Sequence, residues 1–164
     1  MHAPRSLGAF GFTMALSLFG VSGLVTKCAP PSVSAPIDIS TECNNLVNVQ
    51  RSAAGLAPLT IVGFLNSAAE QHSTDQAKRR KMTHTGSNGS NAGQRMTANG
   101  YRWSTWGENV AAGQPDCTSV IGAWMNSEGH RANILNPAMT DIGIGAVAAT
   151  DGTIYWTMEL AAPR

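Results

Sequence analysis

The chain has 164 residues, 43% of them hydrophobic, and this length fits one domain with a substantial core. Its 11 Lys and Arg residues nearly balance its 10 Asp and Glu residues. No broad basic field is therefore present to hold nucleic acid, and we expect no nucleic-acid partner.

The first 28 residues have the order of a secretory signal peptide, because Arg5 is followed by an apolar run over 7–25 and a polar exit. Two alternatives remain open. The apolar run approaches the ~20 residues that span a bilayer and so allows an uncleaved anchor, although its glycines and serines weaken that reading. Cys28 allows a lipoprotein signal, although Lys27 lies where such signals require a small neutral residue. We predict a signal peptide at 1–28, a secreted or cell-envelope-associated protein, and no stable membrane span after cleavage.

A Pro- and Ser-rich segment over 29–40 is predicted to be a linker, and the domain is predicted to occupy 41–164. Apolar residues at helical spacing predict a first helix over 42–54. The residues on its apolar face are Leu46, Val49 and Ala53.

Thr60 is expected to cap a longer helix over 61–81, whose last turn carries four cations that suit the negative end of the helix dipole. We expect these cations to be solvated rather than to contact a membrane. The inner stripe of this helix consists of Ile61, Leu65, Ala68, Ala69 and His72. We interpret His72 first as a hydrogen-bonded core histidine and second as a site residue.

The segment 82–89 is a Gly-, Asn- and Ser-rich loop, which is expected to present His84 to solvent. A short helix is predicted over 92–99. The run 107–112 is predicted to be a central strand.

In the last third of the chain, Asp116 is expected to cap a helix, and Asp151-Gly152 predicts a tight hairpin. The predicted elements there are a helix from 117 to about 127, a turn or short helix over 130–135, and strands over 142–148 and 153–160. In the last strand, large apolar residues alternate with polar ones. Four helical segments and about three strands predict an α+β fold.

Removal of the leader would leave two cysteines, Cys43 and Cys117. An even number of cysteines in an exported protein predicts a disulfide bond. Two unpaired buried thiols are the alternative.

Glu108 and His130 are unusual choices for an ordinary core. Glu108 lies between Trp106 and Val110, and His130 follows Gly129 directly after a predicted helix. Charged groups are rarely buried without a partner. We therefore expect other groups to compensate Glu108.

Three separated motifs lie in the order found in a known family: His84-Thr85-Gly86, GEN at 107–109, and GHRANILNP at 129–137. On these motifs the chain resembles the bacterial branch of the CAP superfamily over roughly residues 42–160. That superfamily groups cysteine-rich secretory proteins, antigen 5 and pathogenesis-related proteins, and its domain is also called SCP. The resemblance implies a three-layer α-β-α sandwich around a small central, mainly antiparallel sheet.

The resemblance also implies a cleft lined by two His and two Glu residues. Carried over motif by motif, three of these residues are His84, Glu108 and His130. The fourth departs from the pattern, since Ser127 replaces the Glu of eukaryotic relatives and Glu128 follows one residue late. We expect Glu128 to face water.

The neutral imidazoles of His84 and His130 would suit a divalent metal such as Zn²⁺, with Glu108 as third ligand or as base for bound water. No H-E-x-x-H motif and no Ser-His-Asp or Cys-His constellation is evident. Asn109 is interpreted as tying loops together through backbone hydrogen bonds.

Two functions remain at this point. The favoured one is a secreted binding module whose cleft holds a divalent metal, a small extracellular ligand such as a lipid or wall fragment, or both. The alternative is a metal-assisted hydrolase or peptidase that uses Glu108 as general base. Binding is favoured because one of the four cleft positions departs from the family pattern and no substrate-specific motif is present.

Overall fold

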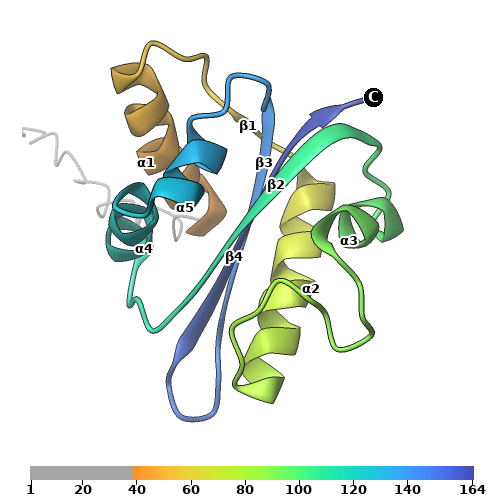
Figure 1. Cartoon of the computed structure of the whole chain (residues 1–164). Coiled ribbons are helices and arrows are strands. Elements are labelled where there is room, and N and C mark those ends of the chain that lie inside the picture. The colour runs from red at the N-terminus through yellow and green to blue at the C-terminus, as the bar shows by residue number, and fades with distance from the viewer. Residues whose placement is uncertain (1–38) are drawn as a thin grey trace, which may run out of the picture. The chain divides into compact units, whose positions relative to one another are not determined.

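A mixed four-stranded sheet forms the middle layer of the structure, and helices lie on both of its faces (Figure 1). The computed structural model describes residues 39–164, and the predicted signal peptide lies outside them. In chain order the elements are α1 (Ile39–Ala53), β1 (Thr60–Ile61), α2 (Gly63–Arg79), α3 (Ala92–Ala98), β2 (Trp103–Ala112), α4 (Cys117–Met125), α5 (Glu128–Ile134), β3 (Asp141–Ala148) and β4 (Ile154–Pro163).

The strands follow the order β1-β3-β4-β2 across the sheet. β1 runs parallel to β3, whereas the β3–β4 and β4–β2 pairs are antiparallel. β3 and β4 form the predicted hairpin, and its turn contains Gly152 with φ of 84°, a value that glycine adopts without strain. The prediction that β2 is a central strand is wrong. β4 pairs with both β3 and β2, which leaves β2 at an edge of the sheet.

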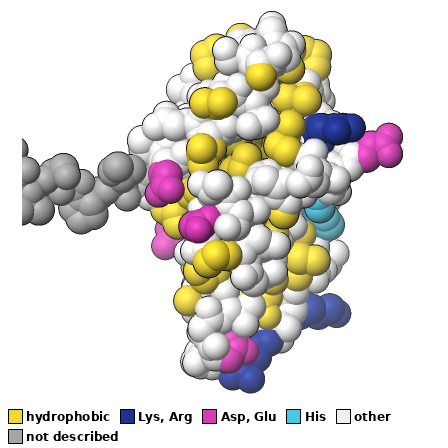
Figure 2. Space-filling view, turned by 90° about the vertical axis from the view of Figure 1, so that its left-hand side faces the viewer, with side chains coloured by type: hydrophobic (Ala, Val, Ile, Leu, Met, Phe, Trp, Pro, Cys, Tyr) yellow, Lys and Arg dark blue, Asp and Glu magenta, His cyan; other side chains and the backbone are white. Residues whose placement is uncertain are grey.

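Helices α1, α4 and α5 cover one face of the sheet, and α2 and α3 cover the other (Figure 1). The three-layer α-β-α sandwich is therefore confirmed. On the side formed by α1 and α4, charged side chains are scattered among apolar and neutral polar ones (Figure 2). No helix within residues 39–164 combines the length and apolar character needed to cross a membrane.

α2 lies directly on β3 because two positions of that strand are glycine. A Cβ atom added at Gly143 or Gly145 would lie less than 3.0 Å from backbone atoms of α2, closer than real Cβ atoms are found. The helix therefore occupies space that any side chain would need. This contact buries four residues of the predicted inner stripe: Leu65, Ala68, Ala69 and His72.

The start of α2 differs from the prediction. Thr60 and Ile61 form the two-residue strand β1 against β3, and α2 begins only at Gly63. Thr60 therefore does not cap the helix. A strand of two residues has no period to detect, so only its pairing with β3 reveals it.

α1 begins at Ile39, two residues before the predicted start of the domain, and it buries a different face from the predicted one. Val49 is 60% exposed, and Ala53 is also exposed. The buried face consists of Ser40, Cys43, Asn44, Val47 and Arg51. Arg51 is tolerated there because its guanidinium donates hydrogen bonds to backbone carbonyls. These carbonyls belong to Ala57, Ile134, Asn136 and Met139.

A disulfide bond joins α1 to α4. Asp116 caps α4 as predicted, accepting a hydrogen bond from the Ser119 amide at 2.7 Å, and Cys117 lies in the first turn. Cys117 is bonded to Cys43, with their Cα atoms 5.0 Å apart, so the predicted pairing is confirmed. The core around it includes Val47, Val120, Ile121, Trp124 and Trp156.

Replacing Gly145 by Ala should lower the free energy of unfolding by about 1–3 kcal/mol, because the added methyl group would meet the α2 backbone. Gly122→Ala is the matched control, since no atom lies within 4 Å of a Cβ added at this position in α4. The control should be neutral or slightly stabilising. Urea unfolding would measure both variants, and equal stability would contradict a close-packed α2–β3 contact.

Replacing Cys43 and Cys117 together by Ala should lower the free energy of unfolding by about 4 kcal/mol, the chain-entropy value for a sequence separation of 74 residues. Thermal unfolding followed by circular dichroism would measure the loss. Thiol titration of the unfolded, unreduced protein, produced without residues 1–28, should find neither Cys43 nor Cys117 free. Two titratable thiols would contradict the pairing.

Candidate functional site

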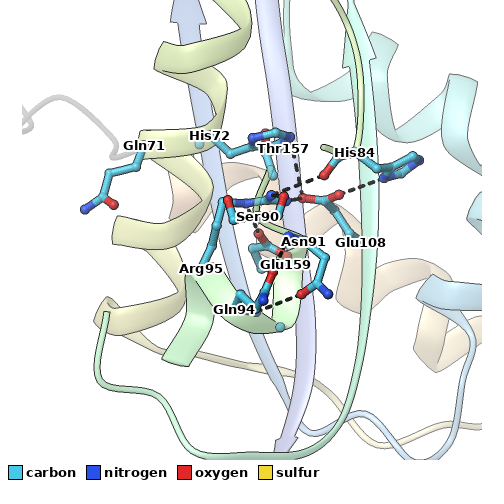
Figure 3. Close-up of polar contacts among 12 residues, drawn as sticks. Gln71, His72, His84, Ser90, Asn91, Gln94, Arg95, Glu108, Thr157 and Glu159 are labelled. Carbon is cyan, nitrogen blue, oxygen red and sulfur yellow. Dashed lines mark hydrogen bonds and ion pairs between the residues drawn. The ribbon is translucent and has the colours of Figure 1, made fainter. Parts of the chain in front are cut away.

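Glu108 lies on the edge strand β2 and is only 6% exposed. Its carboxylate contacts residues of α2 and α3 (Figure 3). Because side chains alternate along a strand, the next residue, Asn109, points to the opposite helix layer. Consecutive residues of this edge strand therefore reach both helix layers.

Both oxygens of the Glu108 carboxylate have partners. Nδ1 of His84 lies 2.7 Å from Oε1, and Arg95 donates to Oε2. Nε2 of His72 lies 3.9 Å from the same Oε2. The expected compensation of the buried charge is thus provided by a cation and an imidazole (Figure 3).

Arg95 connects the loop that carries His84 to the sheet. Besides Glu108, its guanidinium donates to the backbone carbonyls of His84 at 3.1 Å and Ser90 at 2.9 Å. α3 itself starts at a capping box between Asn91 and Gln94, which fixes the helix relative to the same loop. The position of His84 therefore depends on Arg95.

Glu159 of β4 is directly opposite Glu108 in the sheet and is fully buried. Neither of its carboxyl oxygens has a hydrogen-bond partner among the described residues, and the nearest cation atom is Arg95 Nε at 3.8 Å. Burial, followed by repulsion from Glu108, raises the pKa of Glu159 well above its ordinary value. Burial beside Glu108 therefore favours the neutral form of Glu159 over the charged one.

His72 is a buried, hydrogen-bonded histidine, as predicted. It is 1% exposed, and its Nε2 lies 2.7 Å from the backbone carbonyl of Thr83, to which it donates. Burial, and then the charge of Arg95, lowers the pKa of His72, so the ring stays neutral. His72 therefore approaches the Glu108 carboxylate from the interior of the protein rather than from its surface.

His84 and His130 approach β2 from opposite helix layers. The His84 side chain is 59% exposed, and its hydrogen bond to Glu108 raises its pKa. His130 lies on α5 and is half-buried; burial, and then the charge of His84, lowers its pKa. We call His84, Glu108 and His130 the edge site.

Asn109 holds the α5 side of the edge site. Its Nδ2 donates to the His130 carbonyl at 3.1 Å, and its Oδ1 accepts from Asn133 Nδ2 at 2.8 Å. Asn133 also donates to the Glu108 carbonyl. Asn109 makes the predicted hydrogen bond to backbone, but the element that it ties to β2 is the helix α5 rather than a loop. Glu128, at the start of α5, is exposed and faces water as expected.

The sequence did not predict Arg95 or Glu159 as neighbours of Glu108. Glu159 alternates with apolar residues in β4, a pattern that is equally typical of a solvated strand face. Arg95 lies in a short helix without a motif of its own. The sequence indicated Arg95 only indirectly, because a Glu buried on β2 requires a cationic partner.

Within residues 39–164, no group of three or more His, Cys, Asp or Glu side chains is arranged to hold a metal ion. His84 Nε2 and the His130 ring are the imidazole donors that the edge site offers. Both Glu108 oxygens are engaged by His84 and Arg95. The edge site can therefore offer a metal ion two protein ligands more readily than three.

The histidines of the edge site should titrate in opposite directions from the ordinary value of about 6.5, His84 above it and His130 below it. Proton NMR titration of the ring protons would measure both. Because the folded-state pKa of His84 is raised, its contribution to stability is fully present below the unfolded-state value and is lost as pH rises through the folded-state value.

Glu108→Gln should bring the pKa of His84 back toward its ordinary value, and Glu128→Gln should leave it unchanged. An unaltered His84 titration in the Glu108 variant would contradict the cause assigned here.

The model of the CAP family, described as the cysteine-rich secretory protein family, matches residues 45–160. YkwD of Bacillus subtilis is 40% identical over 134 residues, which cover 82% of this chain and 50% of YkwD. The membrane protein YlbC of the same organism is 31% identical over 101 residues, covering 62% of this chain and 29% of YlbC. The chain thus spans half or less of these relatives.

Two solved structures share the fold. An extracellular protein containing an SCP domain from Bacillus anthracis superposes with a TM-score of 0.68 at 28% identity, covering 74% of this chain and 39% of that one. An outer surface protein from Borrelia burgdorferi gives 0.70 at 22% identity, covering 76% and 92%. By the match across residues 45–160 and the identity to YkwD, this chain belongs to the CAP family of cysteine-rich secretory proteins.

Proposed function

We propose that this chain is the ligand-binding domain of an exported protein and that it binds through the edge site. The proposal rests on one observation: the His84 ring and the His130 backbone carbonyl, from opposite helix layers, bind the side chains of the consecutive edge-strand residues Glu108 and Asn109. This tethering offers two imidazoles at the surface while their supporting contacts remain in the interior.

The orientation of His84 supports a divalent metal as part of the bound species. Glu108 holds Nδ1, so Nε2 points away from the carboxylate, as carboxylate partners orient metal-binding histidines. His84 Nε2 and the His130 ring would be the protein donors for an ion such as Zn²⁺, whose remaining positions water or ligand oxygens would fill. Glu108 would orient His84 rather than bind the ion.

The ligand proposed for the edge site is a small extracellular molecule, such as a lipid or wall fragment, whose oxygen atoms contact the imidazoles or the ion. Metal-assisted hydrolysis with Glu108 as general base has less support, because His84 and Arg95 already occupy its oxygens. A hydrolase would show turnover of peptide or ester substrates that Glu108→Gln abolishes while the fold stays intact.

Three observations support export. The first 28 residues have the order of a signal peptide. The disulfide between Cys43 and Cys117 is typical of oxidising compartments. Two structural neighbours are described as an extracellular protein and an outer surface protein.

The purified exported protein should bind Zn²⁺ at pH 7.5 and much more weakly at pH 5, because protonated imidazoles cannot ligate. His84→Ala and His130→Ala should each remove most of the affinity in titration calorimetry. Glu108→Gln should weaken it about 10-fold or more, as loss of a partner that orients a metal ligand does.

Glu128→Gln is the control, since it alters an exposed carboxylate at the start of α5 and should leave the affinity unchanged. Zn²⁺ affinity that survives in the His84→Ala/His130→Ala double variant would contradict a metal at the edge site.

A further inference from the structure

Two adjoining pockets lie on either side of α3, apart from the edge site. An open polar pocket of about 510 Å³ is lined by α2, the loop 86–90 and α3. An aromatic pocket of about 440 Å³ is lined by Trp103, Trp106 and the other side of α3. Gln94 and Ala98 line both, so the pockets meet across α3. Neither is lined by His84 or His130.

Hydrogen bonds hold the walls of the polar pocket in place. The side-chain amides of Gln71 and Asn99 pair reciprocally, at 2.9 and 3.2 Å, and join α2 to the end of α3. The loop closes on itself through a bond from the Gly86 amide to the Ser90 carbonyl. It is also tied to α2, because the Ser87 amide donates to Asp75 at 2.9 Å. The pocket is therefore largely formed before a ligand arrives.

The polar pocket offers hydrogen-bonding groups but no unpaired charge. Its charged residues are Asp75 and Arg95, and each already has an ionic partner, Arg79 and Glu108 respectively. The rest of its polar lining consists of hydroxyl, amide and imidazole groups. Gln94 uses its carbonyl oxygen in the capping box, which leaves its N–H groups for a ligand (Figure 3). A neutral, hydroxyl-rich ligand fits this lining better than an ion does.

The aromatic pocket supplies a ring face. Trp103 and Trp106 meet edge to face with centroids 6.2 Å apart, and Trp106 is 36% exposed. Glycine at 93 lets both rings lie against α3, because an added Cβ would fall within 3.0 Å of them. Trp103 Nε1 donates to the Gly93 carbonyl at 2.9 Å, which fixes the pair. The partly exposed Trp106 ring thus offers an apolar surface beside the polar pocket.

We propose that the two pockets together bind a short neutral oligosaccharide. A pyranose ring has hydroxyl groups around its rim and an apolar face of C–H groups. One ring would place its hydroxyls among the amides of the polar pocket, and its neighbour would lay its apolar face on Trp106. The saccharide would cross α3 at Gln94, whose side chain lines both pockets.

The test titrates the exported protein with three neutral trisaccharides: cellotriose, maltotriose and triacetylchitotriose. At least one should bind at millimolar concentration or tighter and change the tryptophan fluorescence. Trp124 and Trp156 are at most 1% exposed, so the change would come from Trp103 and Trp106. Trigalacturonate, a charged trisaccharide, should bind at least 10-fold more weakly. No binding by any neutral trisaccharide, or equal binding of the charged one, overturns the proposal.

Substitutions at Trp106 and Gln94 test the ring face and the N–H donors separately. Trp106→Ala should reduce affinity at least 10-fold, and Trp106→Phe should recover part of it, because a ring face is restored. Gln94→Glu keeps the acceptor that caps α3 but removes the N–H donors, so it should also weaken binding. Phe64→Ala, which removes a 56% exposed aromatic ring outside both pockets, should have no effect. Unchanged affinity in correctly folded Trp106→Ala and Gln94→Glu proteins overturns the proposal.

The saccharide site and the edge site can be tested independently. His84→Ala and His130→Ala should leave trisaccharide affinity unchanged, since neither histidine lines the two pockets. Loss of trisaccharide binding in both histidine variants would place the ligand at the edge site and overturn the assignment to the α3 pockets.

Discussion

The direct contact between the α2 backbone and β3 is the constraint on which the rest of this structure depends. Glycine at 143 and 145 removes the side chains that would otherwise hold the helix away from the sheet. At this short separation, the polar residues Ser73 and Gln76 of α2 reach Thr157 of β4. A strand face that carries polar residues is therefore buried and hydrogen-bonded instead of solvated.

The Arg95–Glu108 pair acts mainly by fixing positions. Desolvation of two buried charges offsets most of their attraction, so such a pair is weak evidence for added stability. Arg95 also binds the carbonyls of His84 and Ser90, and one guanidinium thereby sets the loop against β2.

Features that depend on a few neighbouring residues were predictable from the sequence, as the Asp116 cap and the hairpin at 151–152 show. Features that depend on the assembled sheet were not. β2 lies at the edge because β4 lies between β3 and β2, and no local sequence pattern encodes this strand order. Glu159 was unassigned because a period of two cannot tell a covered face from a solvated one. The motifs contain His84, Glu108 and His130, whereas Arg95, which positions the loop of His84, belongs to no motif.

The net charge of the edge site depends on the exposed residue His84, because the buried Glu108 and Arg95 beneath it carry opposite charges. Glu108 and Arg95 form an ion pair. Burial shifts the pKa of His72 down and that of Glu159 up, which favours the neutral form of both. The pKa of surface-exposed His84 is instead raised by its bond to Glu108. Protonation of His84 therefore changes the charge at the surface of the edge site.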